Sequence, residues 1–249
     1  MTELNELTII IPVKIDSDDR LSNLDIVVNY LQSNVTSNII VCEQDIEPKL
    51  EGRYTCKYMY IKMGNNFNKS KSINTAAKVT KTPVLAVYDT DAIVTVGQLV
   101  KATKVILDKH AHVVYPYDGK FYDVPKKYHN ILKETGDLNA VNPDECKLFN
   151  NNSVGGAVLF DTDVFLRYGG ANEKFEGWGY EDNELYVRFQ KVGCLIGRTT
   201  RPLLHLTHER VKPAFYDRNL EEKNRQVMEI IHKMTQEQLI EEINSWSWR

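Results

Sequence analysis

Few cysteines and no long apolar run limit what this chain can be. Its 249 residues include four cysteines in no CxxC spacing, which indicates a reducing compartment and argues against a zinc site. No stretch reaches the roughly 18 consecutive apolar residues of a membrane-spanning helix. Residues 1–20 also lack a basic start followed by a long apolar core, as a secretory signal would have. We therefore expect a cytoplasmic protein without a transmembrane segment.

An excess of positive charge is missing as well. The formal net charge is −3 and the sequence pI is about 6.1, which argues against a nucleic-acid or anionic-membrane partner bound by bulk electrostatics. Apolar residues make up 42% of the chain and charged residues 26%, as in an ordinary globular protein. We expect one α/β domain over residues 1–213, with residues 214–249 as a C-terminal helical extension packed on it.

Apolar β-branched runs alternate with helical periodicity over the first 115 residues. The run LTIIIPV is typical of a strand covered on both faces, and Pro12 should mark its end. A helix should follow, with Asp18 or Asp19 as its N-cap. The pattern predicts strands at residues 7–13, 38–42, 57–61, 84–88 and 112–115, and further helices at residues 70–79 and 95–109. This alternation is typical of a mostly parallel central sheet flanked by helices.

The periodicity fades between Pro116 and Asn152, in a polar stretch longer than a typical connection. We expect a functional lid or a mobile excursion there. The later pattern predicts a strand at residues 153–160, a short helix capped by Asp161, a helix at residues 181–192 and extended backbone at residues 194–207. Residues 217–246 should form one or two helices, with a break near residue 234 because Thr235 and Gln238 make a capping box.

Two carboxylates, Asp89 and Asp91, end the apolar run VLAVYDTDAIV. Side chains two residues apart in extended backbone point the same way, so both carboxylates could face one cation at the sheet edge. Hard divalent cations prefer such oxygens and usually complete their shell with substrate phosphates. An isolated DxD is also common as an Asp-rich turn, so its interpretation depends on the other motifs.

A second acidic cluster, EGWGYEDNE, spans residues 176–184. An indole between two glycines offers a platform for the apolar face of a sugar, beside carboxylates that can bind hydroxyls or accept a proton. Acidic residues in a first turn also suit the helix dipole, which is the purely structural interpretation.

Two further segments could bind a metal or an anion. His205 and His208 in LLHLTHER are suitable ligands for a manganese-like metal, although a single histidine is more often structural. No helix with a third ligand completes a zinc site. The segment NFNKSKSIN places Lys69 and Lys71 at a helix start that could hold a base or a diphosphate, or form a solvated helix face.

Taken in order, these segments resemble a known enzyme family. The succession PVK, FNKSKSIN, YDTD, GGAVLF, FEGWGYEDNELYVRF and H-x-x-H-x-R resembles glycosyltransferases of the GT-A fold. It is most similar to the β-1,4-galactosyltransferase type and to bacterial family 2 and capsule-synthesis relatives. The matching segments span residues 7 to about 210, in the family's order. The resemblance implies a nucleotide-diphospho-sugar transferase fold and a hexosyltransferase activity.

The resemblance also implies roles for particular residues. Asp91 and His208 would bind the metal, with His205 as the reserve ligand, and Asp182 would be the catalytic base. The implied donor-binding residues are Pro12, Lys14, Phe67, Lys69, Asp89 and Asp91, and the implied sugar- or acceptor-binding residues are Gly156, Trp178, Gly179 and Glu181. The chain departs from the family's GWGGED pattern by having Tyr180 for the second glycine and Asn183 for a further acid. These changes leave the transferred sugar and the acceptor open.

The implied reaction moves a hexose or N-acetylhexosamine from a UDP-sugar to a carbohydrate or glycolipid acceptor, with inversion, in bacterial surface polysaccharide or glycoconjugate synthesis. Mn²⁺ is the implied cofactor, with Mg²⁺ as a weaker substitute. No nucleic-acid partner is expected, and peripheral membrane association stays open. Glu181 and Asp182 should diverge by roughly 100° on a helix, so they should not do the same job. Following the resemblance, we assign sugar hydroxyls to Glu181 and the proton to Asp182.

Three alternatives remain at this point. A retaining GT-A transferase would share the fold and the metal. A sugar-nucleotide pyrophosphorylase should have a glycine-rich, basic signature after the first strand, where this chain reads PVKIDSDDR. A non-catalytic carbohydrate-binding module would not need DTD, EDNE and HLTH together.

Overall fold

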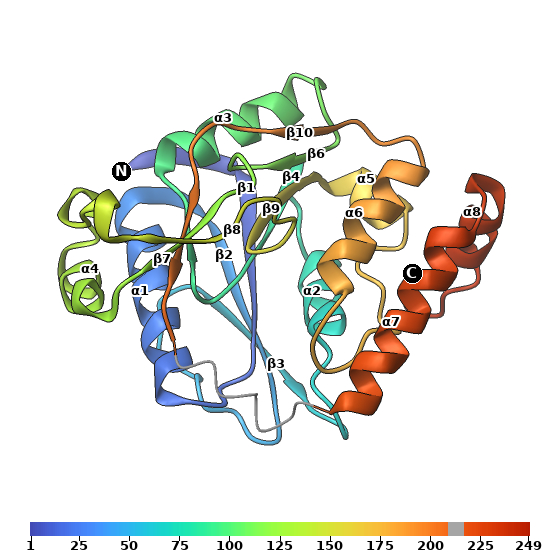
Figure 1. Ribbon diagram of the computed structural model, residues 1–249, viewed down its shortest axis with the longest axis horizontal. Coiled ribbons are helices and arrows are strands. Elements are labelled where there is room, and N and C mark those ends of the chain that lie inside the picture. The colour runs from blue at the N-terminus through green and yellow to red at the C-terminus, as the bar shows by residue number, and fades with distance from the viewer. Residues whose placement is uncertain (209–216) are drawn as a thin grey trace.

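The computed structural model describes residues 1–208 and 217–249, whose strands form two sheets (Figure 1). The larger sheet has the order β10-β6-β9-β4-β1-β2-β3. Its strands are β1 (Thr2–Val13), β2 (Val35–Asp45), β3 (Lys57–Lys62), β4 (Val84–Tyr88), β6 (Val113–Tyr115), β9 (Ala157–Asp161) and β10 (Ile196–Arg198). Among them only β9 runs antiparallel to its neighbours, so the sheet is mostly parallel, as predicted.

The smaller sheet has the order β5-β11-β7-β8 and was not predicted. Its strands are β5 (Ala92–Ile93), β7 (Phe121–Val124), β8 (Lys147–Asn150) and β11 (Leu203–Leu206). The segment between β6 and β9 supplies β7 and β8, together with α4 (His129–Thr135) and the 3₁₀ helices η1 (Lys126–Tyr128), η2 (Leu138–Ala140) and η3 (Pro143–Glu145). This segment therefore has secondary structure of its own, which the sequence analysis did not predict. All four residues of β8 are exposed, so it lacks the alternation of apolar side chains that would have indicated a strand.

The remaining helices are α1 (Asp18–Asn34), α2 (Lys69–Ala77), α3 (Val96–Leu107), α5 (Thr162–Arg167), α6 (Glu181–Lys191), α7 (Arg218–Lys233) and α8 (Gln236–Asn244). The predicted N-cap of α1 was wrong. Ser17 has extended backbone and its Oγ accepts from the Arg20 N–H over 3.2 Å. Asp18 and Asp19 lie one position later, in the first turn, where their carboxylates suit the helix dipole.

Two hydrophobic clusters stabilise these layers. The main cluster surrounds β1, where Leu7, Ile9, Ile10 and Ile11 are fully buried because helices cover both faces of the sheet. A smaller cluster joins the end of α6 to α7 and α8 through Val192, Ile231, Leu239, Ile243 and Trp246. Helices α7 and α8, in red, lie beside α6 at the right of Figure 1.

The C-terminal helices follow the sequence prediction closely. Thr235 and Gln238 form the capping box that begins α8, so the predicted break near residue 234 is confirmed. By contrast, β9 begins at Ala157 and not at the predicted residue 153. The left-handed backbone of Gly156, with φ of +80°, is incompatible with a strand. Within the described residues, no helix has the length and apolar character needed to cross a membrane.

Candidate functional site

The pairing of β4 with β9 positions the DTD turn. These strands are antiparallel with Tyr88 opposite Ala157, so the chain leaves β4 beside the loop that precedes β9. The Asp89 N–H donates to the Gly156 carbonyl over 2.8 Å. The turn is thus hydrogen-bonded to a segment that lies more than sixty residues later in the chain.

The two glycines of that loop have different neighbours. A Cβ on Gly156 would lie 2.5 Å from Cζ of Phe121, so close packing excludes a side chain there. A Cβ on Gly155 would lie 2.3 Å from Oδ2 of Asp182. Gly155, and not the Gly156 that the resemblance implied as a binding residue, is therefore the glycine that lies against the predicted base.

Asp91, His205 and His208 come together where the DTD turn meets β11. One ligand atom from each residue lies within 4.8 Å of the other two. The Asp91 carboxylate lies 3.8 Å from Nε2 of His205 and 3.5 Å from Nε2 of His208. The Leu206 N–H donates to the Asp91 carbonyl over 2.7 Å, which joins β11 to the turn. One carboxylate and two imidazoles fit a divalent transition metal better than Mg²⁺, which prefers oxygen alone.

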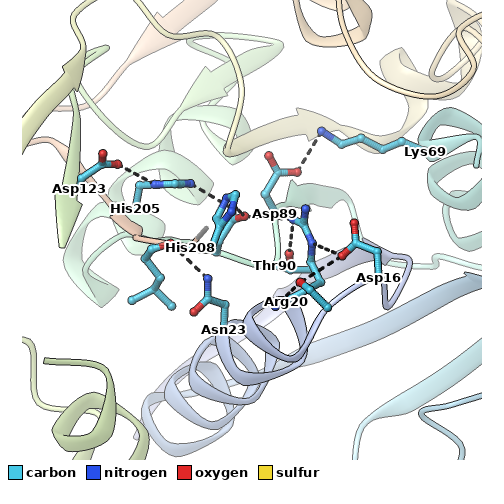
Figure 2. A network of polar contacts seen from close by, with 12 residues as sticks. Asp16, Arg20, Asn23, Lys69, Asp89, Thr90, Asp123, His205 and His208 are labelled. Carbon is cyan, nitrogen blue, oxygen red and sulfur yellow. Dashed lines mark hydrogen bonds and ion pairs between the residues drawn. The ribbon is translucent and has the colours of Figure 1, made fainter. Parts of the chain in front are cut away.

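His205 is held in place by its surroundings. Its Nδ1 lies 2.8 Å from Oδ1 of Asp123 on β7, as Figure 2 shows. The rings of Phe121 and Phe149 stack with the imidazole at centroid distances of 6.3 and 6.2 Å. A carboxylate on Nδ1 favours the tautomer whose Nε2 is free to bind a metal, and here Nε2 faces Asp91. Sequence reasoning missed Asp123 because it lies in the stretch without clear periodicity.

Arg20 is a second residue that the sequence analysis missed. From the first turns of α1, its Nη1 donates to Oδ2 of Asp91 over 3.1 Å and to Oγ1 of Thr90 over 3.2 Å. Its Nε lies 3.4 Å from Asp16 (Figure 2). The guanidinium therefore connects the loop after β1 to the DTD turn. No local pattern distinguishes it from an ordinary solvated arginine near a helix start.

Lys69 lies at the centre of a second polar group, at the start of α2. Its ammonium is 2.9 Å from Asp89, 3.2 Å from Asp182 and 3.8 Å from Glu181. Figure 2 shows the Lys69 side chain extending toward Asp89. The predicted divergence of Glu181 and Asp182 is thus wrong for their charged ends. The helical angle sets only the directions of their Cβ atoms, and both side chains are long enough to turn toward the same cation.

Burial and charge alter the proton affinities of this group. Burial raises the pKa of Asp182 to about 7; the Lys69 ammonium opposes this shift, whereas Glu181 and Asp89 add to it. Burial lowers the pKa of Lys69, but attraction to the three carboxylates outweighs it, so the pKa lies well above its usual value. Asp182 therefore holds a proton more readily than an ordinary aspartate, although it lies beside a charged lysine.

The glycine-rich loop before α6 presents an exposed indole. Trp178 is 59% exposed, and Tyr180 has left-handed backbone with φ of +69° at the N-cap of α6. The Gly179 N–H donates to Oε2 of Glu181 over 3.0 Å. Glu181 thus contacts both its own loop and Lys69, which ties the loop to the polar group.

The other predicted donor residues lie around the same sheet edge. Pro12 is buried in β1 opposite Cys42 of β2, and Lys14 follows the strand end. Phe67 precedes α2, and its carbonyl accepts from the Gly177 N–H over 2.7 Å. The segment FNK is therefore hydrogen-bonded to the glycine-rich loop.

Comparisons with known proteins agree with this geometry. The family model described as glycosyl transferase family 2 matches residues 44–168, and that described as the N-terminal domain of galactosyltransferase matches residues 138–211. A search of curated protein sequences finds no match.

Solved structures share the fold at low identity. A Drosophila β-1,4-galactosyltransferase 7 mutant, in complex with manganese, UDP-Gal and xylobiose, is 18% identical with a TM-score of 0.55. The match covers 90% of this chain and 80% of that one. Glucosyl-3-phosphoglycerate synthase from Mycobacterium tuberculosis, in complex with Mn²⁺, UDP and phosphoglyceric acid, is 11% identical with a TM-score of 0.52. That match covers 81% of this chain and 71% of the other. Because the family model spans half of the sequence, the chain belongs to glycosyl transferase family 2 and is a glycosyltransferase of the GT-A fold.

Proposed function

We propose that this enzyme transfers a hexose or N-acetylhexosamine from a UDP-sugar to a carbohydrate acceptor, in a metal-dependent reaction that inverts the configuration at C1. The observation that carries the proposal is that a metal-ligand set and a cluster of carboxylates around Lys69 lie next to each other at one sheet edge. Asp91 lies with His205 and His208, and Asp89, two residues earlier, lies with Lys69 and Asp182. The DTD turn therefore links a metal-ligand set to a candidate base.

Asp91, His205 and His208 would hold the divalent metal, and their mixed oxygen and nitrogen donors favour Mn²⁺ over Mg²⁺. When bound, the metal supplies positive charge that neutralises the diphosphate leaving group. Two of the structural neighbours, whose names include manganese or Mn²⁺ with UDP-Gal or UDP, support this assignment. Lys69 and Asp89 would orient the donor beside the metal.

Asp182 would accept the proton of the acceptor hydroxyl. Its pKa of about 7 supports this role, because a general base is most effective when its pKa lies near the working pH. The exposed indole of Trp178 would stack on the apolar face of a sugar, and Glu181 would bind its hydroxyls. A base opposite the leaving diphosphate implies one displacement, so an α-linked donor would give a β-linked product.

The resemblance to capsule-synthesis enzymes extends the proposal to bacterial surface polysaccharide or glycoconjugate as the product. The test is incubation of the purified enzyme and Mn²⁺ with a panel of UDP-sugars and saccharide acceptors, followed by NMR of the products. We expect one UDP-sugar to be consumed and a β-linkage to form. An α-linked product would assign a retaining mechanism instead, and failure to transfer or hydrolyse any donor would contradict the proposed donor class.

A further inference from the structure

The amino edge of the central sheet, opposite the DTD turn, contains a hollow of about 610 Å³. It opens where β1 and β2 separate. The register pairs Glu3 with Thr36 and then Thr8 with Asn38, so a single β2 residue, Ser37, stands opposite four residues of β1. Such a break in the ladder leaves backbone and side-chain polar groups without their usual strand partner. The volume is in the range of small-molecule sites.

The lining of this amino-edge hollow is rich in hydroxyl groups and positive charge. Six of the lining residues carry a hydroxyl, and Lys57 and Lys81 add two ammonium groups. None of the lining residues carries a carboxylate. Neither lysine makes an ion pair within residues 1–208 and 217–249, although acidic residues outnumber basic ones in the chain, 34 to 31. The hollow is therefore a local site of positive charge on a weakly acidic protein.

Several hydroxyls of the lining already bond neighbouring side chains. Thr8 and Thr82 bond each other over 2.7 Å, and Thr55 accepts from Gln32 over 2.8 Å. The Oγ of Ser37 lies beneath the surface of the hollow and has no hydrogen-bond partner. A hydroxyl can donate one hydrogen bond and accept two, so the bonded threonines keep acceptor capacity toward the hollow.

We propose that this hollow is a second ligand site that binds a carbohydrate carrying an anionic group. Lys57 and Lys81 would bind the phosphate or carboxylate as point charges. The accessible threonine hydroxyls of the lining would bond the sugar oxygens, which can both donate and accept. The preference for a carbohydrate over other anions rests on the proposed function, whereas the binding of an anion does not.

The proposed site is separate from the catalytic residues. Parallel strands place their carboxyl ends at one edge and their amino ends at the other. The DTD turn follows the end of β4, whereas Thr80 and Lys81 precede its start. Occupation of this site therefore needs no contact with the metal-ligand set, and its binding can be measured without metal or donor.

The test uses glucose 6-phosphate, inorganic phosphate and glucose as separate probes of the metal-free enzyme, with binding measured by calorimetry. We expect glucose 6-phosphate to bind more tightly than either fragment. The double variant Lys57→Ala/Lys81→Ala should bind it at least about tenfold more weakly. A double variant with the same charge change on exposed helix positions, Lys104→Ala/Lys223→Ala, should bind like the natural enzyme. Lys69→Met should also bind glucose 6-phosphate normally. That result would exclude the sheet edge that carries the DTD turn as the binding site.

If inorganic phosphate bound as tightly as glucose 6-phosphate, the hollow would hold an adventitious ion only. Unchanged binding of glucose 6-phosphate in the double lysine variant would overturn the site. Measuring UDP with Mn²⁺ on the same variants keeps these outcomes distinct from failure of the proposed function.

Discussion

Asp182 has the raised pKa expected of the proposed general base, although the nearby Lys69 ammonium opposes the shift. The carboxylate lies 3.2 Å from Lys69 and against Gly155, which has no side chain to displace it. Asp182→Asn preserves the shape of the side chain but cannot accept a proton. We expect kcat to fall by about 10² to 10⁴ while UDP binding persists, measured by steady-state kinetics and by calorimetry. An Asn variant with nearly normal kcat would show that another group removes the proton.

The pH dependence of activity should report the same carboxylate. As the proposed base, Asp182 would act only when unprotonated, so kcat should decrease as the pH falls through its pKa of about 7. The Lys69 ammonium lowers that pKa, and Lys69→Met should therefore move the acidic limb of the pH–rate profile to higher pH. Lys71→Met, an exposed position two residues later on the same helix, is the matched control and should leave the limb in place. If the acidic limb stays at the same pH in Lys69→Met, the group whose titration limits kcat is not Asp182.

The metal ligands can be distinguished from residues that orient them. Asp91→Ala, His205→Ala and His208→Ala should each abolish most Mn²⁺ binding, measured by titration in the presence of UDP. Asp123→Asn should weaken Mn²⁺ by about 10- to 100-fold, since it removes only the carboxylate that orients His205.

His232→Ala provides the control for these titrations, because this histidine is exposed on α7, away from the DTD turn. It should bind Mn²⁺ like the natural enzyme. If His205→Ala also bound Mn²⁺ normally, the ligand set would reduce to Asp91 and His208, the pair that the resemblance implied.

The indole of Trp246, two residues after the end of α8, helps to attach the C-terminal helices to the domain. Trp246 is 5% exposed, and a Cβ on Gly169 would lie 2.7 Å from its ring, so the glycine and the indole pack directly. The Arg188 guanidinium lies 5.2 Å from the same ring. Trp246→Ala should lower the free energy of unfolding by about 3–5 kcal/mol in urea titrations. Ile240→Ala, within α8 itself and 38% exposed, should cost far less.

An equally small loss for both variants would mean that α8 does not unfold cooperatively with the sheet.

The C-terminal helices also contact the candidate site, through α7. Asn224 on α7 donates from Nδ2 to the Glu176 carbonyl over 2.9 Å, at the start of the glycine-rich loop. Helix α7 therefore holds the start of the loop that carries Trp178.

At the level of the whole molecule, donor and metal should stabilise the folded state together. Both ligands would contact the DTD turn, whose position depends on pairing between β4 and β9 and between β5 and β11. A ligand that binds only the folded state at 100 times its Kd adds about 2.7 kcal/mol to the free energy of unfolding. We expect UDP with Mn²⁺ to raise the melting temperature more than the sum of the separate shifts. Strictly additive shifts, or an unchanged joint shift in Asp91→Asn, would contradict a shared site.

Patterns within a few residues were sufficient to predict much of this protein. The apolar run of β4, the start of α6 at Glu181 and the capping box of α8 depend on side chains that are neighbours in the chain, so the sequence shows them directly. The convergence of His205 with Asp91 and Asp123 depends instead on strand pairing between segments separated by 82 residues or more. The contacts of Arg20 with the DTD turn likewise join segments about 70 residues apart. Such pairings are selected by the burial of whole faces of a sheet, which no short window of residues contains.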